Sequence, residues 1–181
     1  MIIKDMEGKP FGEGSQIPEI QKATLLEDIN KKLQELGSTA RWKKTPETVP
    51  GSEVLKDKIL VMVDDVVGVL QGFAPHLMVA TDGKASFIHY QGQELEEMLR
   101  EILGHNPNIV LLDHDLSDQL KGPEIAKALK QAGFTGDIVG FSSERYAAKE
   151  FRNTGAIGCV EKEAGDPGLS IKKLADLIVK K

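Results

Sequence analysis

Carboxylates, a hydroxyl and a lysine stand where apolar runs of this sequence end. The run IVLL passes into DHDLSD, KILVMV ends in a pair of aspartates, IVGF ends in two serines, and GCVE ends in a lysine. A single aspartate at such a position is usually a turn or helix-cap residue. A cluster of carboxylates repels itself and requires a cation among its members. The residues that form this set are Asp64, Asp65, Asp113, Ser142 and Lys162.

These residue types fit phosphoryl chemistry. Mg²⁺ binds one or two carboxylates and keeps waters and phosphate oxygens as its other ligands. A hydroxyl and an ammonium group beside the ion could hold the remaining phosphoryl oxygens and offset their charge during transfer. The set therefore predicts a magnesium-dependent site that places a phosphoryl group on an aspartate.

The elements that must position these residues alternate between strand and helix after about residue 57. Strands are predicted at residues 58–65, 108–116, 137–144 and 155–162, and helices at 93–103, 122–133, 144–155 and 169–181. A short helix at 66–74 is expected to stop at Pro75. The runs 77–81 and 85–90 flank Asp82 and Gly83, which fit either a hairpin turn or a loop.

Alternating strands and helices imply parallel strands, because a parallel connection needs a crossover and helices fill that role. The sequence therefore predicts an α/β fold, a doubly wound five-stranded parallel sheet with helices on both faces. In such sheets the functional crevice lies outside the carboxyl ends of the strands. The five residues above stand at those ends and are expected to meet there.

Residues 1–56 form an N-terminal extension before this pattern. One helix is predicted at residues 18–36, with Pro18 in its first turn and an apolar stripe at spacings of four and three. The stripe consists of Leu25, Ile29, Leu33 and Leu36. It is expected to pack on the chain's own domain or on a second copy or partner. The following segment is polar, contains Trp42, and is interpreted as a linker or a draped arm.

Composition excludes several classes of function. The 181 residues carry a formal net charge of -5, which argues against a nucleic-acid partner. One cysteine, Cys159, cannot form an internal disulfide, and no cluster has the spacing of zinc ligands. No apolar run is long enough for a membrane helix. The chain is therefore expected to be cytoplasmic.

Residues 57–181 resemble the receiver domain of two-component response regulators. The resemblance rests on the acidic pair in KILVMVDD, Asp113 in IVLLDHDLSD, Ser142 in IVGFSSE and Lys162 in CVEK. It implies that Asp113 is the phosphoacceptor and that Mg²⁺ is held by Asp64, Asp65, Asp113 and the backbone carbonyl of Asp115. It also implies a histidine kinase or phosphotransfer protein as phosphodonor, and output through contact with a downstream protein.

Several positions depart from the receiver pattern. Glu163 stands where the family usually has proline, and Cys159 stands where an aromatic residue is usual. The family positions that flank the path of the hydrolytic water fall on Asp115 and Glu144. The resemblance implies that these two residues set the lifetime of the phosphoryl group, with Asp115 expected to orient that water or to act as a general base on it.

Two alternatives remain beside a phosphorylatable switch. The stretch DHDLS also resembles the first motif of haloacid-dehalogenase phosphatases, although that family places its acidic pair after the lysine. The other alternative is a pseudo-receiver that keeps the fold and binds partners without phosphorylation. In the main interpretation the chain catalyses only its own phosphorylation and dephosphorylation.

Overall fold

Strands and helices alternate along the chain after an N-terminal helix. The computed structural model describes residues 19–46, 49–144 and 146–181, with side chains from residue 22. The strands are β1 (Leu60–Asp64), β2 (Ala85–His89), β3 (Ile109–Leu112), β4 (Asp137–Ser142) and β5 (Gly158–Glu161). The helices are α1 (Glu19–Glu35), α2 (Ser52–Leu55), α3 (Val67–Ala80), α4 (Leu95–Gly104), α5 (Gly122–Gln131), α6 (Ala147–Phe151) and α7 (Pro167–Val179).

The five strands form one parallel sheet in the order β2-β1-β3-β4-β5. The strands β1 and β3 are apolar and fully buried until the aspartates that end or follow them, as expected for central parallel strands. The connection from β1 leads outward to β2, and the chain then returns to the other side of β1 as β3. This reversal opens a crevice at the carboxyl ends of β1 and β3. The predicted fold class is confirmed.

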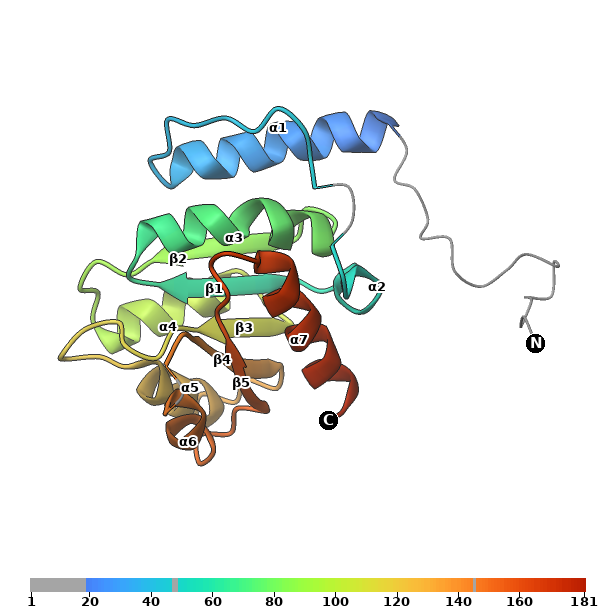
Figure 1. Cartoon of the computed structure of the whole chain (residues 1–181). Helices are drawn as coiled ribbons and strands as arrows, with labels where there is room; N and C mark the ends of the chain where they lie inside the picture. Colours follow the sequence, from blue (N-terminus) through green and yellow to red (C-terminus); the bar gives the residue numbers. More distant parts are fainter. Residues whose placement is uncertain (1–18, 47–48, 145) are drawn as a thin grey trace, which may run out of the picture.

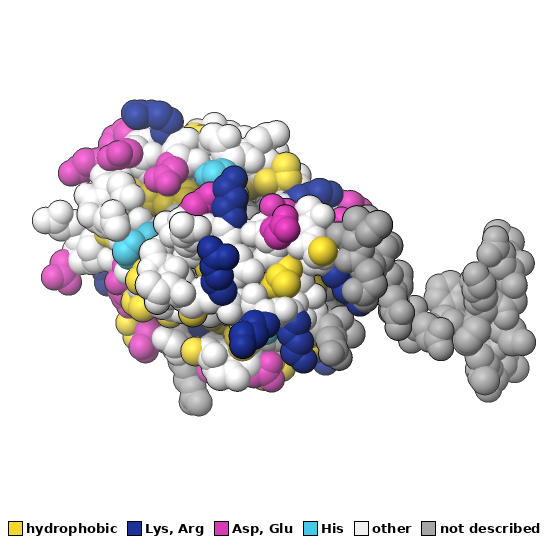
Figure 2. All heavy atoms as spheres, turned by 90° about the horizontal axis from the view of Figure 1, so that it is seen from above, with side chains coloured by type: hydrophobic (Ala, Val, Ile, Leu, Met, Phe, Trp, Pro, Cys, Tyr) yellow, Lys and Arg dark blue, Asp and Glu magenta, His cyan; other side chains and the backbone are white. Residues whose placement is uncertain are grey.

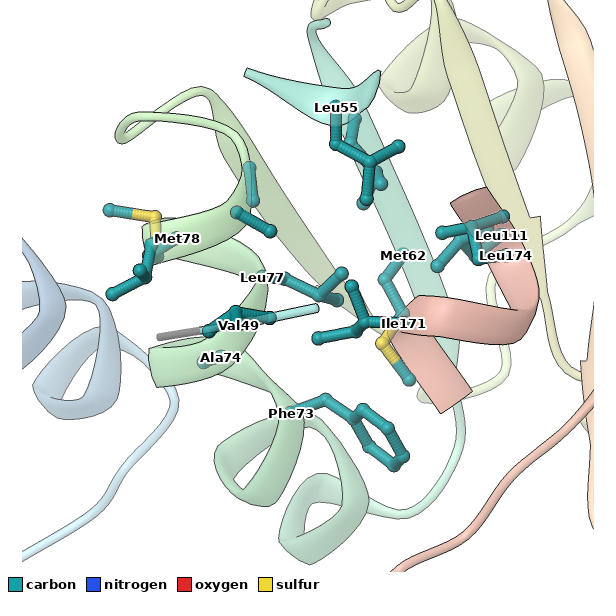
Figure 3. Packing of buried hydrophobic residues seen from close by; sticks show 14 of the residues in the cluster. Val49, Leu55, Met62, Phe73, Ala74, Leu77, Met78, Leu111, Ile171 and Leu174 are labelled. Atoms are coloured by element: carbon teal, nitrogen blue, oxygen red, sulfur yellow. The ribbon is translucent and has the colours of Figure 1, made fainter. Parts of the chain in front are cut away.

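Helices cover both faces of the sheet (Figure 1). Side chains alternate along each strand, so Leu60 and Met62 of β1 belong to one buried cluster and Val61 and Val63 to another. The first cluster is closed by α3 and α7, and the second by α4, α5 and α6. Leu77 of α3, which lies with Met62 and Ile171 in the middle of the first cluster, is fully buried (Figure 3).

The helix α3 continues through Pro75 instead of stopping before it. The prediction of a helix ending at that proline is therefore wrong, and the run 77–81 belongs to the end of the helix. An interior proline costs a hydrogen bond and about 3 kcal/mol. Here the loss is offset by burial, since α3 is apolar on two sides and packs on both the sheet and α1. Asp82 and Gly83 form a loop into β2, which pairs parallel to β1.

The helix α1 forms a further layer outside α3 (Figure 1). Leu25, Ile29 and Leu33 are buried in the first cluster, and Leu36 packs against it. The predicted packing of this stripe on the chain's own domain is confirmed, whereas Pro18 lies outside the described residues. The face of the molecule on the side of α1 carries charged side chains of both signs with scattered apolar patches (Figure 2).

The segment after α1 is held against this helix by hydrogen bonds between the Asn30 side chain and the backbone of Trp42. Asn30 accepts a hydrogen bond from the Trp42 backbone N–H at 2.8 Å and donates to the Trp42 carbonyl at 3.1 Å. The Trp42 ring meets the His76 ring edge-on, with 5.7 Å between ring centroids. The predicted arm is therefore draped over α3 and shares the core of the sheet.

Two further features concern the helices. The helix α6 spans only Ala147–Phe151, which is shorter than the predicted 144–155, and a turn follows in which the Thr154 hydroxyl donates to the Phe151 carbonyl at 2.8 Å. Among the described helices, none combines the length and apolar character that a membrane span requires.

Candidate functional site

Three aspartates meet at the carboxyl ends of two neighbouring strands. The strands β1 and β3 pair with Val63 opposite Leu112, so the next residues, Asp64 and Asp113, lie side by side. One carboxylate oxygen from each of Asp64, Asp65 and Asp113 lies within 4.8 Å of the others. Asp64 is fully buried and Asp113 is 8% exposed. The spacing predicted from the ends of the apolar runs thus brings the acidic set together.

Lys162 bridges two of these carboxylates. Its Nζ lies 2.7 Å from Asp64 Oδ2 and 2.7 Å from Asp113 Oδ1. The second Asp64 oxygen accepts a hydrogen bond from the Val66 backbone N–H at 2.9 Å. Lys162 reaches the cluster because it follows β5, whose neighbour β4 pairs with β3, and its own backbone N–H donates to Ser142 O at 3.1 Å.

The site shifts the pKa values of its members. Burial raises the pKa of Asp113, and attraction to Lys162 opposes that rise without cancelling it. Burial and then repulsion from Asp113 raise the pKa of Asp65. Burial alone would lower the pKa of Lys162, but attraction to Asp64 and Asp113 outweighs it and the pKa is raised. The lysine therefore stays charged. Burial and repulsion still destabilise the ionised forms of Asp65 and Asp113.

The excess of negative charge in the cluster fits a divalent cation. Three carboxylates face one ammonium group, so negative charges outnumber positive charges in the cluster. The available donors are carboxylate oxygens, the ligands that hard cations such as Mg²⁺ prefer. Asp65 is the most accessible of the three, so the cluster can exchange ligands with solvent.

Ser142 and Glu144 lie on the next strand end. Ser142 closes β4 beside β3, is 3% exposed, and its Oγ accepts a hydrogen bond from the Glu144 backbone N–H at 3.1 Å. The hydroxyl can rotate to donate to another acceptor. Glu144 is exposed and forms no hydrogen bond through its side chain with the described residues. The structure therefore places Ser142 at the predicted edge.

The carboxylate of Asp115 lies apart from the acidic cluster and is held by other groups. Lys121 Nζ lies 3.0 Å from its Oδ1, and the Tyr146 hydroxyl donates to its Oδ2 at 2.9 Å. His114 Nδ1 also lies 2.9 Å from Oδ2. These three contacts, that of His114 first, lower the pKa of Asp115 to about 2. The side chain thus points its charge toward α5 and α6.

His114 joins the loop after β3 to α6. Its ring is buried, and Nε2 lies 3.0 Å from Glu150 Oε2 while Nδ1 faces Asp115. Burial alone would lower the pKa of His114, but contact with the two carboxylates outweighs it and the pKa is raised. No sequence pattern indicates this link, because Glu150 lies on a separate helix.

A second histidine borders the cluster and was also missed. His89 ends β2, the strand beside β1, and its Nε2 lies 3.0 Å from the Asp65 carbonyl oxygen. A sequence signal existed for it, since His89 is a polar residue at the end of a predicted strand.

The two departures from the receiver pattern have structural partners. The Glu163 backbone N–H, which a proline would lack, donates to Ser170 Oγ at 2.8 Å, and the Ser170 hydroxyl donates to the Glu161 carbonyl at 3.1 Å. Ser170 is fully buried and fastens the end of β5 to α7. Cys159 is half-buried against the second cluster, and burial raises the pKa of its thiol.

Comparison with known proteins bears on the fold. No protein-family model and no curated protein matches the sequence. Among solved structures, the BeF3-activated DrrB receiver domain is 17% identical with a TM-score of 0.51, and the match covers 66% of this chain and 96% of that one. A LuxR-family DNA-binding response regulator from Staphylococcus aureus is 18% identical, with a TM-score of 0.50 and coverage of 67% and 95%.

The receiver domain of the histidine kinase CKI1 from Arabidopsis thaliana, solved with Mg²⁺ and BeF3⁻, is 18% identical. Its TM-score is 0.53, and the match covers 72% of this chain and 93% of that one. These structures share the parallel sheet and the order of elements rather than the sequence. The chain therefore has the fold of the receiver domains of response regulators.

Proposed function

We propose that this chain is a phosphorylatable signalling switch in two-component signal transduction. Asp113 accepts a phosphoryl group from a phosphohistidine of a histidine kinase or phosphotransfer protein. The observation that carries the proposal is the buried pairing of Asp113 and Asp64 with Lys162, next to Asp65. A buried cluster in which carboxylates outnumber cationic groups is costly unless a cation completes it.

The transfer step uses groups already in place. A carboxylate oxygen of Asp113 attacks phosphorus, the bond between phosphorus and the imidazole nitrogen breaks, and the imidazole keeps the electron pair. Lys162 stays charged and can follow the negative charge from the carboxylate to the transferring oxygens. Ser142 has a hydroxyl that can donate to a phosphoryl oxygen, and burial of Asp64 keeps Lys162 oriented.

The cation supplies charge neutralisation for the phosphoryl oxygens when it is bound. Asp64, Asp65 and Asp113 would hold it as Mg²⁺, together with the backbone carbonyl of Asp115 that the receiver resemblance implies. Hydrolysis of the phosphoryl group returns the switch to its unphosphorylated state. Asp115 and Glu144 are the residues proposed to set the rate of this hydrolysis. We place the protein in the cytoplasm, with output through contact with a downstream protein or with a second copy of the chain.

The proposal is tested by exposing the full chain to Mg²⁺ and a small phosphodonor such as acetyl phosphate and measuring its intact mass. We expect one phosphoryl adduct in the wild type and none in Asp113→Asn, because the amide is nearly isosteric but a poor nucleophile. Asp118→Asn is the matched control, since Asp118 is an exposed aspartate of the same loop.

Two results would contradict the proposal. An undiminished adduct in Asp113→Asn would move the phosphoacceptor to another residue. A wild type that takes no phosphoryl group, with circular dichroism showing a folded chain, would favour the phosphorylation-independent binding module.

A further inference from the structure

A groove of about 470 Å³ lies between α5 and α6, on the side of the phosphoacceptor loop away from α3 and α7. We call it the α5–α6 groove. Its charged and polar lining consists of Lys121, Glu124, Lys127, Lys149, Glu150 and Asn153. Neither the receiver resemblance nor the acidic site accounts for it.

The charged side chains that face this groove differ in whether they contact another residue. The Glu124 carboxylate accepts a hydrogen bond from the Lys121 backbone N–H at 2.9 Å, and Glu150 is in contact with His114. By contrast, Lys127 and Lys149 form no ion pair with any other residue that the structure describes. The groove therefore presents unpaired ammonium groups whereas its carboxylates are already engaged.

Two residues of the groove wall also touch the residues that follow Asp113. Lys121 Nζ lies 3.0 Å from Asp115 Oδ1, and Glu150 Oε2 lies 3.0 Å from His114 Nε2. The exposed Tyr146 precedes α6 and donates to Asp115. Each wall of the groove thus contributes a residue that directly contacts the loop after Asp113.

We propose that the α5–α6 groove binds an acidic segment of a partner protein and that this binding is coupled to the state of Asp113. The recognition follows from charge complementarity, with Lys127 and Lys149 as the principal contacts and the Asn153 amide as a further donor. The coupling rests on the proposed function, because it requires that Asp113 be phosphorylated.

The sign of the coupling follows from two electrostatic effects that act together. A phosphoryl group adds negative charge beside Asp115 and repels an acidic ligand nearby. It also strengthens the attraction that holds Lys121 on this loop, so the positive charge of Lys121 is kept from the acidic ligand. The acidic segment therefore binds the unphosphorylated chain more tightly, and by reciprocity its binding disfavours phosphorylation.

The first test measures the groove itself. A fluorescein-labelled peptide of glutamates is titrated with the full chain at low salt, and its anisotropy gives the dissociation constant. We expect Lys127→Gln/Lys149→Gln to weaken binding by about tenfold. Lys172→Gln/Lys180→Gln, which removes two exposed lysines of or next to α7, should weaken it by no more than about threefold. Equal losses in the two double variants, or no loss in the first, would overturn the proposal.

The second test measures the coupling, with Mg²⁺ and beryllofluoride as a stand-in for the phosphoryl group. We expect the dissociation constant of the wild type to rise by about threefold or more over that with Mg²⁺ alone, and that of Asp113→Asn to stay unchanged. An unchanged or lower constant in the wild type would overturn the coupling. If the chain took no phosphoryl group, the proposed function would fail while the first test still decided the groove.

Discussion

Lys162 is the residue on which the acidic cluster depends in the absence of a metal ion. Its side chain is 9% exposed and pairs with a fully buried Asp64. We expect Lys162→Met to lower the free energy of unfolding by about 3 to 5 kcal/mol, because it leaves buried charges without a partner. Urea unfolding followed by circular dichroism measures this change.

Lys173→Met is the matched control, since the described ion pairs of Lys173 are with the partly exposed Glu161 and Glu163. Surface pairs contribute little, so its effect should be much smaller. A loss in Lys162→Met no larger than in this control would show that the cluster tolerates its charges without the lysine. Added Mg²⁺ should recover part of the loss, because the ion replaces the missing positive charge.

Tyr146 and Lys121 determine where the Asp115 carboxylate lies. The sequence predicts that Asp115 orients the hydrolytic water, and the structure holds that carboxylate away from the acidic cluster. We expect Tyr146→Phe, which removes one of the three contacts on this carboxylate, to loosen it and to speed loss of the phosphoryl group by about threefold or more. Asp115→Asn should slow the loss more than Glu144→Gln does. The rates are measured after removal of the phosphodonor.

The double variant Tyr146→Phe/Asp115→Asn separates this effect from a general loosening of the loop. It should lose its phosphoryl group at the rate of Asp115→Asn alone, because the tyrosine acts only through that carboxylate. Faster loss in the double variant would mean that Tyr146 affects the site by another route.

At the scale of elements, α1 contributes to the same core as the sheet. Ile29 is fully buried between α1 and α3. We expect Ile29→Ala to lower the free energy of unfolding by about 2 to 5 kcal/mol, since it leaves a cavity in a packed cluster. Lys31→Ala, an exposed change on the same helix, should alter it by less than about 0.5 kcal/mol.

Thermal or urea unfolding distinguishes the outcomes for α1. A single cooperative transition that shifts in Ile29→Ala would support one shared core. An unshifted main transition would show that α1 detaches before the sheet unfolds, and that the extension behaves as a separate unit.

At the scale of the whole molecule, the arm and the sheet domain are linked through His76. Burial lowers the pKa of His76, whose ring meets the Trp42 ring edge-on, and a backbone hydrogen bond at Gly72 and attraction to Asp166 only partly oppose this. The unfolded chain therefore binds a proton on His76 near the ordinary pKa of 6.5, whereas the folded chain binds this proton only at lower pH. Stability from this group is present above that pH and is lost as the pH falls below it.

We expect the wild type to lose more stability than His76→Gln between about pH 7.5 and pH 5.5. The measurement is urea unfolding at both pH values, with His105→Gln as the control because His105 is exposed. The same pH dependence in the wild type and His76→Gln would show that protonation of this ring does not oppose the docking of the arm.

The sequence by itself predicted the alternation of strands and helices, the polar residues that meet at one edge of the sheet and the apolar stripe of α1, and it left the segment of β2 open. Each of these depends on local pattern, since buried parallel strands read as apolar runs and their polar ends mark one edge of the sheet. Local pattern misplaced the end of α3, because the stabilisation that carries the helix past Pro75 comes from burial against α1 and the sheet.

Only the tertiary structure decided which polar groups meet across elements. Lys162 lies 98 positions from Asp64 along the chain, yet the two form an ion pair at 2.7 Å. The strand ends predicted that both residues lie at one edge of the sheet, but no sequence pattern placed His114 between Asp115 and Glu150 or Tyr146 on Asp115. Such contacts depend on how two loops and a short helix pack, and the periodicity of one segment carries no information about its neighbours in space.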